Sequence, residues 1–131
     1  MSANKEIALR FNDLISLRRL DEAFALTSDD VVFRGPDGTR LDREGLKDLL
    51  QYVWTLMAGP FKTEIVGTTC EGERVAVEMT ASVELVNGGK YENIYHFLVI
   101  VRDGKIVYQA EYCNTKAADV FGDLSNRLIT S

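Results

Sequence analysis

The chain has 131 residues, 46% of them hydrophobic, and a formal net charge of -5, which suits one globular domain spanning residues 1–131. The acidic balance argues against nucleic-acid binding, which requires a clustered basic face. No apolar run approaches the roughly 18 residues of a membrane span, and the N-terminus lacks the apolar core of a signal peptide, so we expect a cytoplasmic protein without membrane contact.

Two helices are predicted at the start of the chain. Between Asn4 and Leu17, apolar residues recur at helical spacing and form one stripe, which indicates an amphipathic helix. A second, shorter helix is expected to begin with Asp21 as its N-cap. The polar residues 27–30 are expected to end that helix, before a short strand over residues 31–34.

The clearest helix follows a turn. Residues 35–38, Gly-Pro-Asp-Gly, are a concentrated turn signal, and Asp42 has the character of an N-cap. Glu44 would lie in the first turn, where the helix dipole favours an acid. Gly59-Pro60 is expected to end the helix. Its apolar face carries Leu46, Leu49, Leu50, Val53, Trp54 and Met57.

The second half of the chain is predicted to be mostly strand. Residues 61–70 alternate loosely between apolar and polar side chains, and residues 74–85 alternate almost perfectly, which indicates one dry and one wet face. Two long β-rich runs, residues 91–101 and 105–114, are expected to form a hairpin.

A C-terminal helical segment, weakened by Gly122, is suggested by the spacing of Ala117, Phe121, Leu124 and Leu128. Helices that precede the strands in sequence favour an α+β domain with helices on one face of an antiparallel sheet. A strongly bent sheet wrapped over three helices would leave a conical cavity, the kind of concave apolar site where ligands bind.

The turn of the long hairpin decides which side chains share a face, because a shift of one residue exchanges the two faces. A two-residue loop, Asp103-Gly104, would pair Arg102 with Lys105. A three-residue loop that includes Arg102 would pair Val101 with Lys105 instead. We favour the three-residue loop, since Arg-Asp suits a type I turn and glycine suits the left-handed position after it.

With the three-residue loop, Tyr95 lies opposite Glu111 on a face that points into the cavity. That face carries Asn93, Tyr95, Phe97, Val99, Val107, Gln109, Glu111 and Cys113. The other face carries Ile94, His96, Leu98, Ile100, Ile106, Tyr108, Ala110 and Tyr112. This second face is apolar enough to need a cover, and packing against a second copy is the simplest one, so we expect a homodimer through the sheet.

The order of elements, together with Leu26-Thr-Ser-Asp-Asp-Val-Val-Phe-Arg-Gly-Pro-Asp-Gly38 and Tyr95-His-Phe…Asp-Gly-Lys-Ile-Val…Glu-Tyr112, resembles the SnoaL-like, ketosteroid-isomerase-like branch of the nuclear-transport-factor-2-like superfamily. The likeness covers about residues 4–116. It implies a cystatin-like α+β cone, with a bent antiparallel sheet wrapped over three helices from the N-terminal half. Members include isomerases, dehydratases, polyketide cyclases, epoxide hydrolases and assembly modules, so the fold does not choose an activity.

The ketosteroid isomerase pattern does not carry over to this chain. Its oxyanion tyrosine falls on Phe11, its aspartate base falls on Gly35, and its second, protonated aspartate falls on Tyr95. All three functional positions have changed type. A steroid isomerase of the usual mechanism is therefore not expected.

Two residues are candidates for chemistry. Glu111 would lie among apolar side chains, where desolvation raises a carboxyl pKa toward the range of a general acid or base, but it could also be a structural or solvent-facing acid. Tyr95 could donate a hydrogen bond to a ligand oxygen, or be a core aromatic whose hydroxyl reaches a neighbour. Ten further residues are expected to line the ligand site: Phe11, Ile15, Phe33, Trp54, Met57, Met79, Asn93, Phe97, Gln109 and Cys113.

The remaining reactive side chains favour simpler roles. His96 alternates onto the opposite face, which suits a dimer-face or core histidine. Cys70 and Cys113 lack a Cys-x-x-Cys spacing and are interpreted as reduced thiols, and no histidine is predicted near Cys113 to make it a nucleophile. No metal-ligand spacing is recognisable, and no cofactor or metal is expected.

Two functions remain open. The first is a cofactor-independent isomerase, dehydratase or cyclase acting on a small, largely apolar ligand, with Glu111 moving a proton and Tyr95 stabilising charge on oxygen. The second is a non-catalytic module that binds a hydrophobic ligand or assembles with a partner protein. Loss of the three isomerase positions favours the second, and a lone acid in an apolar pocket favours the first.

Overall fold

The computed structural model describes the backbone of residues 2–130 and the side chains of residues 2–122. Four helices and six strands follow one another as α1 (Ala3–Ser16), α2 (Leu20–Phe24), β1 (Thr27–Arg34), β2 (Arg40–Leu41), α3 (Arg43–Thr55), β3 (Lys62–Glu71), β4 (Arg74–Glu84), β5 (Lys90–Arg102), β6 (Lys105–Cys113) and α4 (Thr115–Thr130). The predicted C-terminal helix is therefore present. Two of the residues that suggested it, Leu124 and Leu128, lie outside the described side chains.

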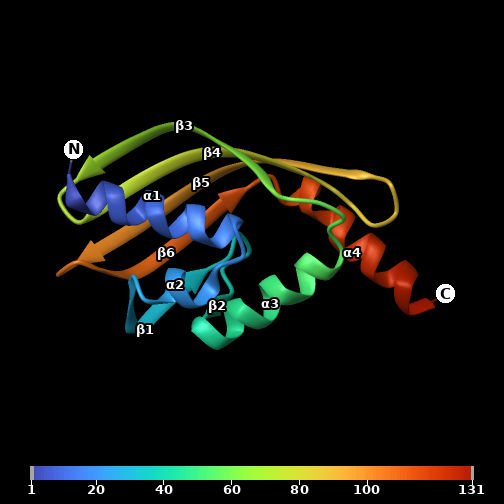
Figure 1. Cartoon of the computed structure of the whole chain (residues 1–131), viewed down its shortest axis with the longest axis horizontal. Helices are drawn as coiled ribbons and strands as arrows, with labels where there is room; N and C mark the ends of the chain where they lie inside the picture. The colour runs from blue at the N-terminus through green and yellow to red at the C-terminus, as the bar shows by residue number, and fades with distance from the viewer. Residues whose placement is uncertain (1, 131) are drawn as a thin grey trace.

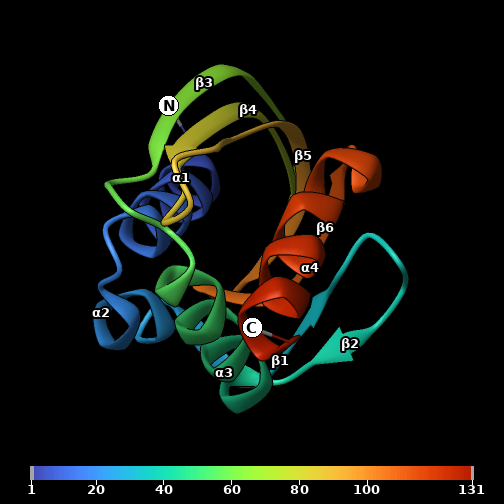
Figure 2. The same ribbon diagram turned by 90° about the vertical axis from the view of Figure 1, so that its right-hand side faces the viewer.

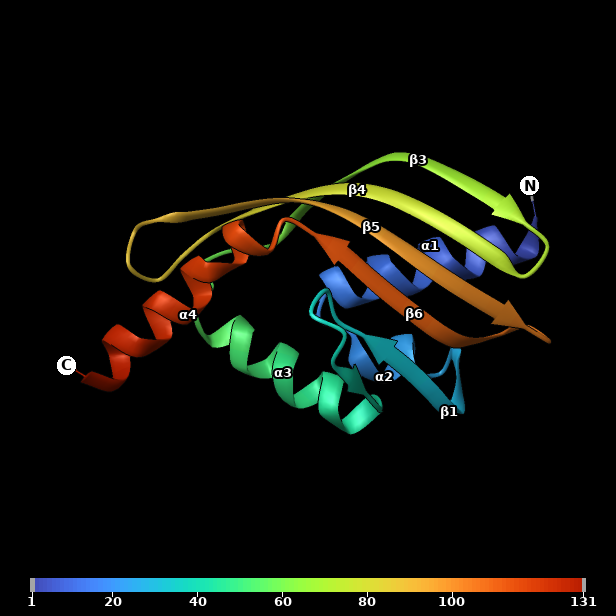
Figure 3. The ribbon, with the colours of Figure 1, turned by 180° about the vertical axis from the view of Figure 1, so that it is seen from behind.

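The strands form one bent sheet in the order β2-β1-β6-β5-β4-β3. It confirms the predicted α+β class with the helices on one face, as the view from behind in Figure 3 makes plain. The predicted sheet was wholly antiparallel, and β1 is the exception, because it pairs with β6 in parallel. In Figures 1 and 2 the long strands curve over α1, while α3 and α4 lie toward the opposite end of the molecule.

The prediction was wrong at the start of β1. Residues 27–30, expected to be a break, are the first half of this strand. Pairing of Thr27 with Ile106 of β6 overrides the polar composition of the segment, since β-propensity depends on the surroundings. Likewise the N-cap of α2 is Arg19, and Asp21 lies inside the first turn. The two-residue β2 carried no sequence signal.

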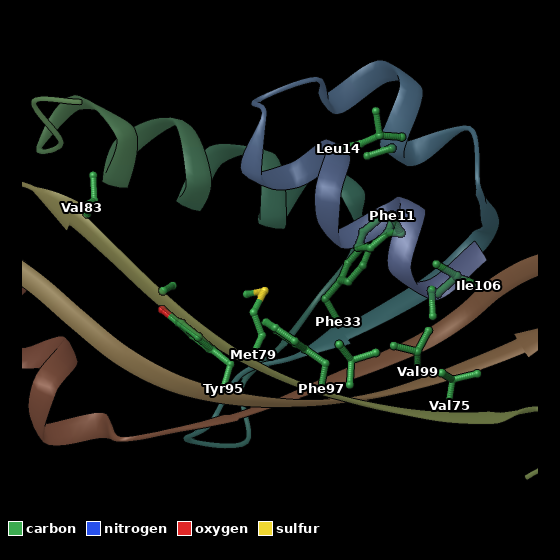
Figure 4. Close-up of a cluster of buried hydrophobic side chains, with 14 of the residues drawn as sticks. Phe11, Leu14, Phe33, Val75, Met79, Val83, Tyr95, Phe97, Val99 and Ile106 are labelled. Carbon is green, nitrogen blue, oxygen red and sulfur yellow. The ribbon is translucent and has the colours of Figure 1, made fainter. Parts of the chain in front are cut away.

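The core lies between α1 and the concave face of the sheet. The ring of Phe11 from α1 stacks on Phe33 of β1, with centroids 5.8 Å apart. Figure 4 shows these rings above the inward side chains of the sheet. In β4 every second residue from Val75 to Val83 is buried, as the alternating sequence predicts.

The hairpin between β5 and β6 has a two-residue loop, so the predicted three-residue loop was wrong. Arg102 pairs with Lys105, and both Asp103 and Gly104 have positive φ, at 52° and 76°. These angles are those of a type I′ turn, for which Asp-Gly is a favoured pair. This turn matches the right-handed twist of the strands, which a type I turn does not.

The extra residue lies further along β6. Val101 pairs with Ile106 but Ile100 pairs with Tyr108, so Val107 forms a β-bulge. At the start of β6, before the bulge, the two predicted faces are exchanged. Ile106, predicted to face outward, is fully buried, and Val107, predicted to face inward, is only partly buried.

Beyond the bulge the predicted inward face is correct. Phe97 lies opposite Glu111, and Tyr95 lies opposite Cys113 rather than Glu111. The acid and the phenol therefore share one face, as predicted, but they are not direct cross-strand neighbours.

The left-handed turn yields the first testable prediction. An alanine at Gly104 would meet no atom within 4 Å, so its effect comes from the backbone alone. Because φ is 76°, we expect Gly104→Ala to lower the free energy of unfolding by about 1–2 kcal/mol in urea denaturation. Gly67→Ala in β3 is the matched control, because it too has open space but no positive φ, and it should cause no loss. Equal losses in both variants would contradict the turn assignment.

Candidate functional site

A hollow of about 610 Å³ lies between α1, α3 and the inward face of β6. Its inner wall is mostly apolar, and a loop over residues 35–39 and the first turns of α4 form other parts of its lining. The lining residues are Phe11, Asn12, Ile15, Phe33, Arg34, Gly35, Pro36, Asp37, Thr39, Leu41, Gly45, Leu46, Leu49, Leu50, Phe97, Gln109, Glu111, Thr115 and Ala118.

The outer wall of the hollow is α3. Its start is fixed by polar contacts: the Asp42 side chain accepts from the Gly45 amide at 2.8 Å, and the Arg43 guanidinium donates to the Thr27 hydroxyl at 2.8 Å and to the Thr27 carbonyl at 2.7 Å. Within α3, however, no side chain is fully buried, although the helix is amphipathic. Leu46, Leu49 and Leu50 of its apolar stripe line the hollow, and Leu49 is 49% exposed. Val53 and Trp54 pack against the edge of the core instead.

Glu111 is the acidic group of the inner wall. It extends from β6 opposite Phe97, and no cation pairs with it among residues 2–122. Burial raises the pKa of this carboxyl, and a hydrogen bond from the Cys113 thiol, 3.8 Å from Oε2, opposes part of that shift. A carboxyl with a raised pKa is poised for acid–base exchange.

Cys113 is a protonated thiol that donates a hydrogen bond to the Glu111 carboxylate. Burial, together with the nearby Glu111 charge, raises the pKa of Cys113 to about 11. The sulfur therefore keeps its proton at neutral pH and donates to the carboxylate. A thiolate nucleophile is disfavoured at this position.

The Tyr95 hydroxyl is turned away from the hollow. It hydrogen-bonds to the hydroxyl of Tyr91, and burial raises the pKa of both phenols. The Tyr95 ring stacks on Phe97 with centroids 5.4 Å apart, and Figure 4 shows its oxygen directed away from Phe11 and Phe33. Tyr95 is not part of the lining of the hollow.

Asn93 connects this tyrosine pair to the end of β6. Its Nδ2 donates to the Tyr91 hydroxyl at 2.7 Å and to the Asn114 carbonyl at 3.0 Å, and its Oδ1 accepts from the Asn114 amide at 3.0 Å. These bonds fix the junction between β6 and α4. They occupy Asn93 with structural contacts.

A pair of buried amides lies beside Glu111. Gln109 of β6 and Asn12 of α1 donate to each other, at 3.2 Å and 3.3 Å, and both line the hollow. Gln109 was anticipated from the strand alternation, whereas Asn12 was missed. The signal for Asn12 was its place on the apolar stripe of α1, between Ala8 and Ile15, where a polar side chain needs a partner.

The ten predicted ligand-site residues separate into two groups. Phe11, Ile15, Phe33, Phe97 and Gln109 line the hollow together with Glu111. The other five, together with Tyr95, lie outside its lining: Trp54 under the Arg18 guanidinium, Met57 in a bridge to Leu85, Met79 against a separate depression beside α1, and Asn93 and Cys113 in the contacts described above.

No sequence pattern predicted the rim of the hollow, because its residues come from a loop and from the ends of other elements. They are Arg34, Gly35, Pro36, Asp37, Thr39, Leu41, Thr115 and Ala118. Among the described residues, no three His, Cys, Asp or Glu side chains converge as a metal site would require. None of the helices in residues 2–130 has the length and apolar composition of a membrane span.

Comparison with known proteins gives a consistent result. Residues 8–109 match the family model described as SnoaL-like domain. None of the curated protein sequences compared with the chain matches it.

Three solved structures illustrate the likeness. An NTF2-like protein of unknown function from Burkholderia pseudomallei is 20% identical, with 92% of this chain and 98% of that chain covered and a TM-score of 0.81. TerC, co-crystallised with polyporic acid, is 22% identical, with 92% and 98% covered and a TM-score of 0.79. IdmH from Streptomyces antibioticus, a candidate polyketide cyclase, is 18% identical, with 90% and 96% covered and a TM-score of 0.77. At these identities the likeness shows the fold alone.

The raised pKa of Glu111 predicts a pH-dependent stability difference. Below the ordinary carboxyl pKa of about 4.3, Glu111 is protonated in both the folded and the unfolded chain, and burial costs little. As pH rises, the unfolded chain releases the proton before the folded one, so folding is increasingly penalised until the raised pKa is passed. Glu111→Gln should therefore gain stability relative to wild type as the pH rises above about 4.3, measured by urea unfolding. The exposed Glu64→Gln serves as the control, and a constant difference for Glu111→Gln would contradict the raised pKa.

Proposed function

The chain belongs to the SnoaL-like domain family, with the NTF2-like fold, and from that premise we propose that it binds a small, largely apolar ligand in the hollow and moves a proton on it through Glu111. The reaction would be an isomerisation, dehydration or cyclisation that requires no cofactor. Each of these can proceed by removal and return of a proton next to a carbonyl or hydroxyl group.

The observation that carries this proposal is the position of Glu111. A carboxylate without a paired cation is costly in apolar surroundings, and it persists here on the wall of a space large enough for a small molecule. A structural acid would be expected to have an arginine or lysine partner, whereas the only hydrogen-bond partner of the Glu111 carboxyl among residues 2–122 is the Cys113 thiol. An acid–base catalyst needs a carboxyl that is poised in this way.

Two of the similar structures support a ligand of this class. TerC was co-crystallised with polyporic acid, and IdmH is a candidate polyketide cyclase. We extend this to the present chain as a proposal: the ligand is a carbon skeleton with few polar groups. Its apolar part would lie along α3, where Leu46, Leu49 and Leu50 line the hollow.

The second candidate is a binding or assembly module without catalysis. The engagement of the Tyr95 hydroxyl by Tyr91 favours it, because the phenol that was expected to stabilise charge on oxygen is occupied. On this alternative the ligand would bind in the same hollow but leave unchanged. The fate of the ligand therefore separates the two candidates.

We also propose a homodimer through the outer face of the sheet. Ile94, 71% exposed, and Tyr112, 49% exposed, lie on this face. The Arg34 guanidinium lies over the Tyr112 ring, 4.8 Å from its centroid.

We also propose that the protein is cytoplasmic. The two unpaired cysteines, Cys70 and Cys113, support this proposal.

Ligand binding can be tested by filling the hollow. Native mass spectrometry and extraction of the purified protein would identify any copurifying molecule, and thermal shifts with apolar ketones and phenols would provide defined ligands. Leu50→Trp should abolish retention and shift, because Leu50 lines the hollow. Tyr52→Trp on the outward side of α3 is the matched control and should change neither.

Glu111→Gln then separates binding from catalysis. We expect the variant to retain the ligand but to lose its conversion by at least about 100-fold, the usual effect of removing a general base. Unchanged conversion would eliminate the assigned role of Glu111. If Leu50→Trp keeps both the ligand retention and the thermal shift of the wild type, the hollow is not the binding site.

The dimer is tested by charge on its proposed interface. Sedimentation should give twice the 14.7 kDa of one chain for the wild type and one chain for Ile94→Arg. The control is Leu17→Arg, an equally drastic change at the end of α1, which lies on the other side of the sheet, at a side chain that is 55% exposed. A monomeric wild-type protein at micromolar concentration would refute the proposal.

A further inference from the structure

We propose that Gln109, held in place by Asn12, donates the hydrogen bond that binds a ligand carbonyl oxygen beside Glu111. The ligands of the hollow would then be enolisable carbonyl compounds. This inference rests on the proposed acid–base function, and it names the second polar group of the site and the substrate class.

The amide pair has a fixed orientation. Asn12 Nδ2 donates to the carbonyl oxygen of Ala8 at 3.0 Å, and a carbonyl can only accept. The NH₂ group of Asn12 must therefore face Ala8, which leaves its Oδ1 to accept from Gln109 Nε2 at 3.2 Å. The α1 backbone thus sets the orientation of Gln109 through Asn12.

This orientation leaves Gln109 with one unused N–H. Its Nε2 carries two hydrogens, and one of them is taken by Asn12. No other acceptor for Nε2 is found among residues 2–122, and Gln109 is 8% exposed. A buried donor without a partner is costly, and an oxygen of a ligand in the hollow that Gln109 lines would satisfy it.

The donor and the carboxyl are suitably spaced. Gln109 and Glu111 are two residues apart on β6 and share the inward face, so their Cα atoms are about 7 Å apart. Gln109 would contact a carbonyl oxygen at about 3 Å, and Glu111 would contact the neighbouring C–H group at about 3 Å. A carbonyl unit held by both contacts fits within that distance. The two side chains can therefore engage one carbonyl unit together.

The step that follows is a proton transfer. The Glu111 carboxylate takes the hydrogen from the carbon next to the carbonyl, the C–H electron pair forms the C=C bond of an enolate, and the carbonyl electrons move to oxygen. The Gln109 N–H stabilises the negative oxygen. Return of the proton from Glu111 to carbon regenerates the ketone or its isomer, so no oxidant, reductant or second substrate is needed.

Tyr95 does not fit this role. Its hydroxyl bonds to Tyr91 and it is absent from the lining of the hollow, whereas Gln109 and Glu111 both line it. The geometry therefore transfers the oxygen-binding role from the phenol to the amide.

The test uses two compounds of nearly equal shape, 2-tetralone and its hydrocarbon counterpart tetralin. Wild-type protein should bind the ketone about 3- to 10-fold more tightly, the effect of one neutral hydrogen bond. In D₂O it should also exchange the hydrogens beside the carbonyl faster than the buffer does, measured by NMR. Gln109→Met should bind both compounds equally and exchange about 100- to 1,000-fold more slowly than wild type.

A second variant guards against misfolding. Gln109→Met alone leaves Asn12 without its partner, whereas Asn12→Leu/Gln109→Met replaces both amides by apolar side chains of similar size, which is often close to neutral for stability. This double variant should show the same losses. Tyr95→Phe is the matched control, and it should keep both the ketone preference and the exchange rate.

The outcomes distinguish this inference from the proposed function. If the wild type binds neither compound, the proposed function fails and the inference fails with it. If Glu111-dependent exchange occurs and Gln109→Met retains both the rate and the ketone preference, only the inference is overturned. Loss of exchange in Tyr95→Phe with retention in Gln109→Met would return the role to the phenol.

Discussion

One extra residue in β6 determines what the hollow contains. The two-residue turn at Asp103-Gly104, continued without interruption, would place Tyr95 opposite Tyr112 and turn Glu111 outward. The bulge at Val107 shifts the register by one, and every later residue of β6 changes face. Gln109 and Glu111 point inward only for this reason. The bulge leaves one residue of β6 unpaired in the ladder, which is a local cost to the fold.

Sequence patterns predicted the parts of the fold that depend on local periodicity. The β4 strand alternates because one of its faces is dry, and α3 begins at Asp42 because that side chain caps it, so both could be found without coordinates. Residues 27–30 were misassigned because the strand that contains them is joined to β6 through Thr27 and Ile106, more than 70 positions apart along the chain, and no local pattern indicates such a contact. The bulge was placed at the turn rather than at Val107, because face alternation detects an extra residue but not where it lies.

The site could be predicted only in part, for a related reason. The inward orientation of Glu111 and Gln109 follows from strand alternation with one added residue. The engagement of Tyr95 by Tyr91 does not, because the two phenols are four residues apart on one strand and meet through side-chain geometry alone. Asn12 illustrates the same limit, since its partner lies on a different element and only the polar interruption of an apolar helix stripe indicates that a partner exists.

The arrangement of α3 connects these features to ligand binding. Protein interiors are normally close-packed, and an apolar hollow forfeits the dispersion contacts that neighbouring atoms would otherwise make. Here the sheet and α1 form a packed core around Phe11, whereas no residue of α3 is fully buried and Leu49 is 49% exposed. Capping by Asp42 and the bonds from Arg43 to Thr27 fix the start of this helix by polar contacts, which do not depend on packing across the hollow. The fold can therefore remain stable while the hollow is empty. A ligand that buries the apolar side chains of α3 would add the missing apolar contacts, and it would place its carbonyl group beside Gln109 and Glu111.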